Sequence, residues 1–314
     1  MRALLCPASL KGVLSAAEAA AALATGVRRA GAEAVEMPVA DGGEGTVEAL
    51  HAALGGAWGE AVVPDPLGRP VSARWLLLPG GRAVVGSAAA IGLPLLTPDE
   101  RDPLRASSRG LGALILAALR ESPGALVVAL GGSATVDGGA GLREVVDALP
   151  VPTIALCDVR TPLADAARLF GPQKGASTQD VMLLERRLAA IEELRPFAAL
   201  PGAGAAGGLG AALAALGADL VPGAATVLDL LGFEERLADI DLVVTGEGAV
   251  DVTTAEGKAP GEVARRAAER RVRCVVFGGR VSAEVTGAET VALSGDPARV
   301  EADLVELGQR LASA

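Results

Sequence analysis

The stretch ALLCPASLKGVLSAAEAA, residues 3–20, decides the fold. Its apolar start, Ala3–Cys6, is typical of a short buried strand. Ser15 and Glu18 follow at the spacing of a capping box, so we predict a helix that begins there and ends at Gly31. One strand, one loop and one helix within about thirty residues begin an α/β fold.

The same alternation of strand and helix continues with a second strand and a second helix. Val35–Val39 predicts a second strand, which ends in the glycine-rich segment ADGGEGT, residues 40–46. A helix that contains His51 follows and ends at Gly55. Strands and helices that alternate at this spacing form parallel sheets.

Residues 59–98 have a different texture, with short β-type runs between prolines and glycines that predict antiparallel strands and a second module. Further along we predict helices over Leu111–Arg120, Gln179–Leu194 and Pro260–Arg271, and strands over Leu126–Leu130, Val151–Leu156, Leu242–Thr245, Cys274–Phe277 and Val291–Leu293. We therefore expect an α/β protein in which residues 1–58 plus 236–314 form one five-stranded parallel sheet. Residues 59–235 form an inserted α/β domain with a mixed sheet.

The composition excludes several classes of partner. The formal net charge of −10 and the pI near 4.8 would repel nucleic acid and anionic membranes, and no apolar run is long enough for a membrane span. The N-terminal residues read as a strand rather than a signal peptide, and Cys6, Cys157 and Cys274 read as small buried hydrophobes. We expect a cytoplasmic protein.

Lysine is unusually rare. Only three of the 28 basic residues are lysines, Lys11, Lys174 and Lys258, and each adjoins a glycine. An ammonium group is a compact point charge that fits tight anion sites where a guanidinium does not, so we expect the three ammonium groups to surround one bound anion. The complete lack of Asn gives the chain a thermophile-like composition.

The loop ALGGSATVDGGAG, residues 129–141, follows a buried strand and contains few bulky side chains. Glycines 131 and 132 allow backbone N–H groups to approach an anion, and the hydroxyls of Ser133 and Thr135 can donate to phosphate oxygens. Asp137 could hold a metal ion or take a proton. The alternative is a tight strand-to-helix turn in which Asp137 caps the helix.

The segment DGGEG, residues 41–45, repeats this pattern. Either the same turn chemistry is used twice, or the two Asp-Gly-Gly corners face each other. Open parallel sheets bind ligands beyond the carboxyl ends of their strands, where Lys11, Asp41 and Glu247 are expected.

The sequence lacks the motifs that other kinds of binding site and catalysis need. GAGAAG, residues 202–207, fits a dinucleotide fingerprint, but no clean strand precedes it, so another glycine loop or close packing is favoured. No HExxH, paired-Cys zinc motif or GxSxG elbow is present, and His51 is expected to be a surface or packing residue. Acids, lysines, glycines and hydroxyls remain, and they suit phosphoryl transfer.

Nine ordered blocks resemble the bacterial glycerate kinase family, in the type without the MOFRL domain. They include ASLKGVLSAAEAA, PVADGGEGTVEAL, GGSATVDGGAG, FGPQKGA, LVVTGEGAVD and GKAPGEVARRA. The resemblance implies a flavodoxin-like domain interrupted by a second one. It also implies transfer of the ATP γ-phosphoryl group to D-glycerate with Mg²⁺, yielding 2-phosphoglycerate. A catalytically silent glycerate or nucleotide sensor is the alternative.

The resemblance also implies site residues, which fall into four groups. The catalytic group is Lys11, Asp41, Asp137, Asp251 and Lys258; the substrate-binding group is Ser9, Gly42, Gly43 and Glu247; the nucleotide-binding group is Gly131, Gly132, Ser133, Thr135, Lys174, Gly204 and Gly207; and Asp158 is the metal ligand. The chain departs from the family pattern at Val136, at Arg160-Thr161 and in a shortened segment between 141 and 151.

Overall fold

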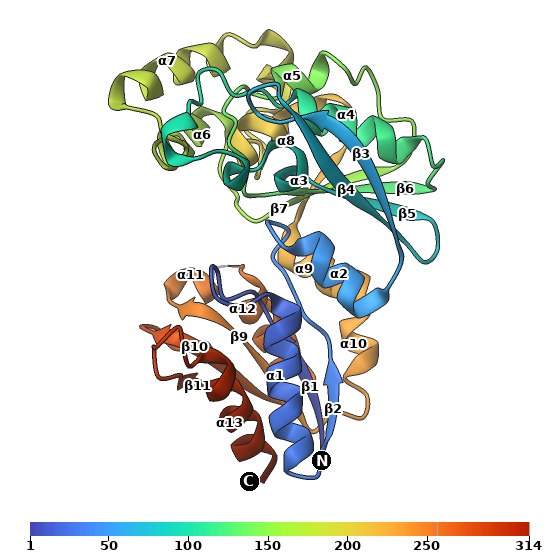
Figure 1. Ribbon diagram of the computed structural model, residues 1–314, viewed down its shortest axis with the longest axis vertical. Coiled ribbons are helices and arrows are strands. Elements are labelled where there is room, and N and C mark those ends of the chain that lie inside the picture. The colour runs from blue at the N-terminus through green and yellow to red at the C-terminus, as the bar shows by residue number, and fades with distance from the viewer. Residues whose placement is uncertain (256, 314) are drawn as a thin grey trace. The chain divides into compact units, whose positions relative to one another are not determined.

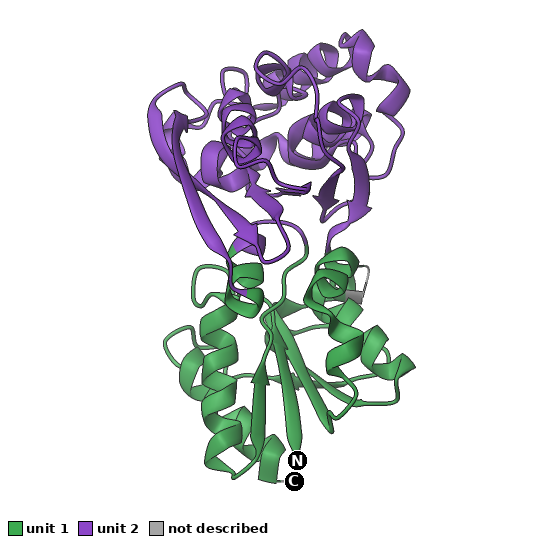
Figure 2. Ribbon diagram, turned by 90° about the vertical axis from the view of Figure 1, so that its right-hand side faces the viewer, with its two compact units in different colours: residues 1–41, 48–54, 224–314 green, residues 42–47, 55–223 purple. Residues whose placement is uncertain are grey.

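The computed structural model describes residues 1–255 and 257–313. The chain forms two compact units (Figure 2). Unit 1 comprises residues 1–41, 48–54 and 224–314, and unit 2 comprises residues 42–47 and 55–223. Within the described ranges, none of the helices combines the length and apolar character that a membrane span requires.

Unit 1 is built on a five-stranded sheet. Its strands are β1 (Arg2–Pro7), β2 (Glu33–Glu36), β9 (Leu242–Val250), β10 (Arg273–Val281) and β11 (Glu289–Ala292). They are arranged β11-β10-β9-β1-β2, and every neighbouring pair is parallel. Counted from β2, this is the flavodoxin-like order, so the prediction of one parallel sheet from both ends of the chain is confirmed.

Two helices, α1 (Ala16–Arg29) and α13 (Val300–Ser313), lie side by side against this sheet (Figure 1). The helices approach so closely that a Cβ on Gly26 would lie 2.0 Å from the carbonyl oxygen of Val305. Buried leucines such as Leu23 and Leu304 join the sheet residue Phe277 in one core cluster. The predicted capping box of α1 is present, with Ser15 and Glu18 bonded reciprocally.

The strands of unit 1 end elsewhere than the sequence predicts, by three or more residues in β2, β9 and β10. β2 ends at Glu36, although the amides of Met37 and Val39 still donate to carbonyls of β1. β9 and β10 run beyond the predicted turns and pair as far as Val250 and Val281. The glycines extend the pairing because they lack side chains: a Cβ on Gly246 would lie 2.2 Å from the carbonyl oxygen of Phe277.

Unit 2 contains the mixed sheet that the sequence predicts. Its strands are β3 (Ala57–Pro64), β4 (Pro70–Leu78), β5 (Arg82–Gly86), β6 (Ala125–Leu130), β7 (Thr153–Cys157) and β8 (Asp219–Pro222), arranged in that order. The first three are antiparallel, and β5 to β8 are parallel. The short edge strand β8 was not predicted, because its four residues include a charge and a proline.

The remaining α-helices are short and complete the two units. They are α2 (Thr46–Leu54), α3 (Ser87–Ile91), α4 (Arg109–Leu119), α5 (Ala140–Arg143), α6 (Ala166–Phe170), α7 (Thr178–Ala189), α8 (Ala205–Ala215), α9 (Gly223–Leu231), α10 (Phe233–Arg236), α11 (Val252–Ala255) and α12 (Ala259–Glu269). The helix predicted over Gln179–Leu194 is α7, which ends at Ala189 and is followed by a 3-10 segment over Glu192–Phe197. Cys6, Cys157 and Cys274 are free and buried, as expected.

The start of α8 is distorted by glycine. Residues 206–208 have positive φ values, and a Cβ on Gly207 would lie 2.1 Å from the carbonyl oxygen of Thr135. Two backbone segments of unit 2 therefore touch here, and only glycine leaves room for the contact.

We predict that Gly207→Ala destabilises the protein more than Gly217→Ala. Both glycines have positive φ, so each substitution costs about 1–2 kcal/mol of backbone energy. Only Gly207 adds a collision, since nothing lies within 4 Å of a Cβ on Gly217. Thermal unfolding should show a Tm several degrees lower for Gly207→Ala than for Gly217→Ala; equal values would show that the close approach is unimportant.

Candidate active site

In unit 1 the polar side chains gather beyond the carboxyl ends of β1 and β9. These strands are neighbours, and their connections lead to opposite sides of the sheet, so this is the switch point where such folds bind ligands. Glu247 lies in the extended part of β9, with 16 % of its side chain exposed. The Thr254 hydroxyl donates to Glu247 Oε1 at 2.8 Å, and Lys258 Nζ lies 3.5 Å from Oε2.

Burial raises the pKa of Glu247 above the ordinary glutamate value, and the charge of nearby Asp41 acts in the same direction. The hydrogen bond from Thr254 and the charge of Lys258 oppose the shift without cancelling it. A carboxylate in this setting has increased basicity and can accept a proton from a substrate hydroxyl.

Lys258 occupies the N-cap position of α12 and faces two carboxylates. Its Nζ lies 3.5 Å from Glu247 and 3.9 Å from Asp251. Hydrogen bonds from the hydroxyl and amide of Thr253 lower the pKa of Asp251, so this carboxylate stays charged. One of the predicted lysines is therefore next to two of the predicted acids.

The loop after β1 carries two more of the predicted residues of unit 1. Lys11 is exposed on a turn, and Ser9 is partly buried. The loop runs beside β9, since Leu10 Cα lies 3.9 Å from the position of a Cβ on Gly248. The sequence thus places Ser9, Lys11, Asp41 and Glu247 on one edge of the parallel sheet, as the strand order requires.

In unit 2 the loop after β6 is held by hydrogen bonds to its backbone and by close packing of neighbouring backbone. The Ser87 hydroxyl donates to the carbonyl oxygen of Gly131 at 2.8 Å and accepts from its amide at 3.1 Å. A Cβ on Gly131 would lie 2.5 Å from Gly43 Cα and 2.9 Å from the amide nitrogen of Glu44. Gly43 therefore packs against Gly131, whereas a Cβ on Gly42 would meet Gly223 and Leu156.

The two Asp-Gly-Gly corners do not face each other. Gly43 of the first corner meets Gly131, whereas Gly138 and Gly139 of the second pack in the interior of unit 2. A Cβ on Gly138 would lie 2.6 Å from the Ile191 side chain, and one on Gly139 would lie 2.3 Å from the Ala212 side chain. The repeated motif serves different neighbours at its two positions.

The Asp137 carboxylate holds its own loop in place by accepting hydrogen bonds. Its Oδ2 accepts from the amide and hydroxyl of Ser108, at 2.8 and 2.7 Å, and from the amide of Gly141 at 3.1 Å. Its Oδ1 accepts from the amide of Gly139 at 3.0 Å. Four donors match the acceptor capacity of a carboxylate, so the geometry is that of a structural turn. The N-cap of α5 is Gly139, however, and not Asp137 as the alternative expected.

Lys174 is inside unit 2 and only 4 % exposed. Its Nζ donates to Ser133 Oγ at 3.0 Å and to the carbonyl oxygen of Thr135 at 2.8 Å. Burial lowers the pKa of this amine to about 7, while the charges of Asp137 and Asp158 oppose the shift. Its charge lies under the loop rather than at a surface, and the expectation of three ammonium groups around one anion stays a prediction.

The remaining predicted residues of unit 2 have varied surroundings. Gly204 and Gly207 make close backbone contacts: a Cβ on Gly204 would lie 2.5 Å from the carbonyl oxygen of Pro162. Close packing, which the sequence left open for this segment, is what their geometry shows. Thr135 is fully buried, and Asp158 is exposed after β7.

The family of the protein follows from comparison with known sequences. The model of the glycerate kinase family matches residues 3–151 and 146–296, most of the chain. The chain belongs to the glycerate kinase family. Glycerate 2-kinase of Escherichia coli K12 is 38 % identical, over 91 % of this chain and 87 % of its own length. Glycerate kinase of Bacillus subtilis 168 is also 38 % identical, over 90 % of this chain and 86 % of its own length.

A solved structure agrees with this assignment. A crystal structure from Salmonella typhimurium LT2, provisionally assigned as glycerate kinase 2, superposes with a TM-score of 0.86 at 33 % identity. It covers all of this chain, and the chain covers 97 % of it. The resemblance to the glycerate kinase family and the α/β fold inferred from it are confirmed.

Some contacts in this glycerate kinase family member were not foreseen from the sequence. Thr254, Ser87 and Ser108 bond to Glu247, Gly131 and Asp137, respectively, but a lone Ser or Thr carries no sequence signal for such a role. Glu44 was visible within the DGGEG motif; its Oε2 lies 3.0 Å from the position of a Cβ on Gly132.

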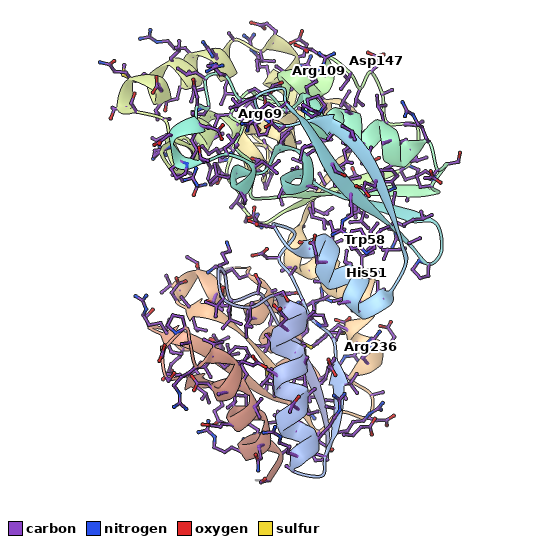
Figure 3. The ribbon with its side chains drawn as sticks, in the orientation of Figure 1. His51, Trp58, Arg69, Arg109, Asp147 and Arg236 are labelled. Carbon is purple, nitrogen blue, oxygen red and sulfur yellow. The ribbon has the colours of Figure 1, made fainter. Side chains whose placement is uncertain are left out.

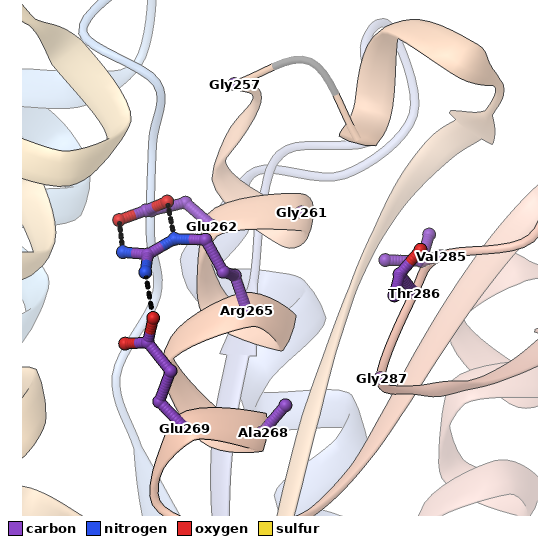
Figure 4. A pocket seen from close by; sticks show the side chains of 9 residues that line it. All are labelled: Gly257, Gly261, Glu262, Arg265, Ala268, Glu269, Val285, Thr286 and Gly287. Atoms are coloured by element: carbon purple, nitrogen blue, oxygen red, sulfur yellow. Dashed lines mark hydrogen bonds and ion pairs between the residues drawn. The ribbon is translucent and has the colours of Figure 1, made fainter.

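Two other features lie apart from these residues. His51 is in the middle of α2 (Figure 3). A surface pocket of about 550 Å³ lies between α12 and the 285–287 loop (Figure 4). Arg265 beside it is held by Glu262 and Glu269, so the guanidinium charge is neutralised.

We predict that Asp137→Asn lowers the free energy of unfolding by about 2–4 kcal/mol, because an amide cannot accept all four hydrogen bonds. Asp180→Asn is the matched control, since Asp180 caps an exposed helix end and should cost about 1 kcal/mol. Denaturant unfolding measures both losses. If the Asp137 variant keeps wild-type stability, the anchoring role is wrong.

Proposed function

We propose that the protein transfers the γ-phosphoryl group of ATP to D-glycerate, with Mg²⁺, to give 2-phosphoglycerate. Membership of the glycerate kinase family supports the reaction class, and the Escherichia coli relative named glycerate 2-kinase supports the product. The observation that carries the proposal is the Glu247, Lys258 and Thr254 cluster at the switch point of the parallel sheet, because it combines a basic carboxylate with a fixed ammonium group.

The residues of unit 1 suit the acceptor. Glycerate carries a carboxylate and two hydroxyls, so the ammonium groups of Lys11 and Lys258 would bind its charge. Ser9 and Asp41 would bond to its hydroxyls. Glu247 would accept the proton of the reacting hydroxyl, since burial keeps its pKa raised. We assign this role to Glu247 rather than to Asp137, whose acceptor sites are filled.

The loop of unit 2 suits the phosphates of the nucleotide. Gly131 and Gly132 are partly exposed, and their lack of side chains lets an anion approach the backbone. Catalysis of phosphoryl transfer is mostly positioning and neutralisation of charge, which such a loop provides.

The described residues fit a metal ion that arrives with the nucleotide. Within residues 1–255 and 257–313, no three His, Cys, Asp or Glu side chains gather to hold an ion by themselves. Mg²⁺ needs only one or two carboxylates when phosphates supply its other ligands. Glu44, next to Gly132, would hold it, with exposed Asp158 as a second candidate. When bound, Mg²⁺ neutralises charge on the phosphates.

The reaction itself is the first test. With ATP, Mg²⁺ and D-glycerate, we expect ADP release that depends on glycerate, and phosphorus NMR of the product should show phosphate on the 2-hydroxyl. Omission of glycerate is the control. ADP release that does not depend on glycerate, or binding of both ligands without turnover, would contradict the proposal; the second result would favour the silent sensor.

We predict that Glu247→Gln lowers kcat by about 10²–10⁴-fold, as loss of a general base does. In the wild type, activity should fall as pH decreases through the pKa of Glu247, because only the ionised form accepts a proton. This acid limb should lie above the ordinary glutamate pKa and disappear from the residual activity of the variant. A pH series of kcat measures both effects.

Glu269→Gln is the matched control, because Glu269 is an exposed carboxylate on α12 that pairs with Arg265. It should keep the wild-type pH profile. An unchanged acid limb in Glu247→Gln would assign the proton acceptor to another residue.

A further inference from the structure

The interior of unit 2 contains a buried amine whose hydrogen bonds go to neutral acceptors. Lys174 ends a 3-10 turn, Pro172–Lys174, and only 4 % of it is exposed. Its ammonium group donates to two neutral acceptors, Ser133 Oγ and the carbonyl oxygen of Thr135. Burying an ammonium group under these conditions is costly and favours loss of its proton.

Both acceptors belong to the loop that follows β6, on either side of Ala134. Lys174 is 41 residues from Ser133 and 39 residues from Thr135 along the chain, so the contacts join two remote segments. Lys174 is thus one of several anchors of this loop, together with Ser87 at Gly131 and the backbone bonds from Leu93 to Gly132 and from Ala134 to Ile91. Both bonds are donated by the amine and are stronger when it carries its extra proton, so its protonation state affects how firmly the loop is held.

A second observation is an unsatisfied polar group in the same loop. The Thr135 hydroxyl is fully buried, and its Oγ1 has no hydrogen-bond partner. The titratable groups whose charges act on Lys174 are Asp137, from the loop, and Asp158, after β7. The neighbouring Gly175 packs on the backbone of Arg101.

We propose that Lys174 is a positioning residue for the nucleotide: it holds the Gly131–Thr135 loop through Ser133 and Thr135, and it takes up a proton when a phosphate group binds the exposed side of that loop. The inference rests on the proposed function, since it requires a phosphorylated ligand. A phosphate anion would add negative charge to that of Asp137 and Asp158 and would stabilise the charged form of the amine further.

The scarcity of lysine makes a direct test possible. Protein labelled with ¹³C at lysine Cε has three lysine signals, from Lys11, Lys174 and Lys258. Lys11→Arg and Lys258→Arg assign them by elimination. In the wild type we expect the Lys174 signal to titrate with a midpoint near its pKa of about 7. Saturating ATP without glycerate should raise this midpoint by about one pH unit, which means tenfold tighter binding to the protonated form.

A kinetic measurement separates positioning from a merely structural role. In the wild type, KM for ATP should increase as pH rises above the Lys174 midpoint, because the protonated form binds better. In Lys174→Met, KM for ATP should be at least tenfold higher at pH 6 and should no longer depend on pH in this range. Ser133→Ala is a second variant: loss of one acceptor should lower the Lys174 midpoint.

The outcomes distinguish this inference from the proposed function. If glycerate is phosphorylated and ATP binds, but the Lys174 midpoint stays where it was, the inference is wrong and the proposed function stands. The same conclusion follows if Lys174→Met retains the wild-type pH dependence of KM. If the wild-type protein neither binds ATP nor phosphorylates glycerate, the proposed function is wrong, and the inference is overturned with it.

Discussion

The close approach of bare backbone around the end of β6 is the constraint on which unit 2 depends. Gly131 lies against Gly43 on one side, and Gly207 lies against the carbonyl oxygen of Thr135 on the other. Any side chain at these positions would move the loop by an ångström or more. Because Ser133 and Thr135 are the acceptors for Lys174, the position of the loop also fixes the surroundings of the buried amine.

The two units present their candidate residues by different means. Unit 1 uses the topology of a parallel sheet, which brings side chains from β1, from β9 and from the segments that follow them to one edge. Unit 2 uses a backbone loop fixed by hydroxyls and by one carboxylate. The first arrangement suits a small substrate whose hydroxyls need specific partners, and the second suits the repeated, identical oxygens of a phosphate chain.

Much of the fold could be predicted because its signals are local. The capping box at Ser15, the alternation of strand and helix, and the antiparallel texture after Gly59 each depend on neighbouring residues. The continued pairing of β9 and β10 could not be predicted, since it depends on which strand lies opposite each glycine.

Part of the candidate site could likewise be predicted from the sequence, and part of it could not. The cluster around Glu247 was predictable from strand order, because the strands that carry it are neighbours in a parallel sheet. The burial of Lys174 was not, as its segment PQKGAST has the composition of an exposed loop. The role of Asp137 was also undecided, because its partner Ser108 is 29 residues away.

The three thiols provide a way to observe each unit separately. Cys6 and Cys274 belong to unit 1 and Cys157 to unit 2, and all are buried and free. Burial raises the pKa of Cys157 and of Cys274 to about 12, so almost no reactive thiolate is present at neutral pH. An alkylating reagent can then modify these cysteines only when the surrounding structure opens. The labelling rate at each position would therefore report local opening of one unit, without any engineered probe.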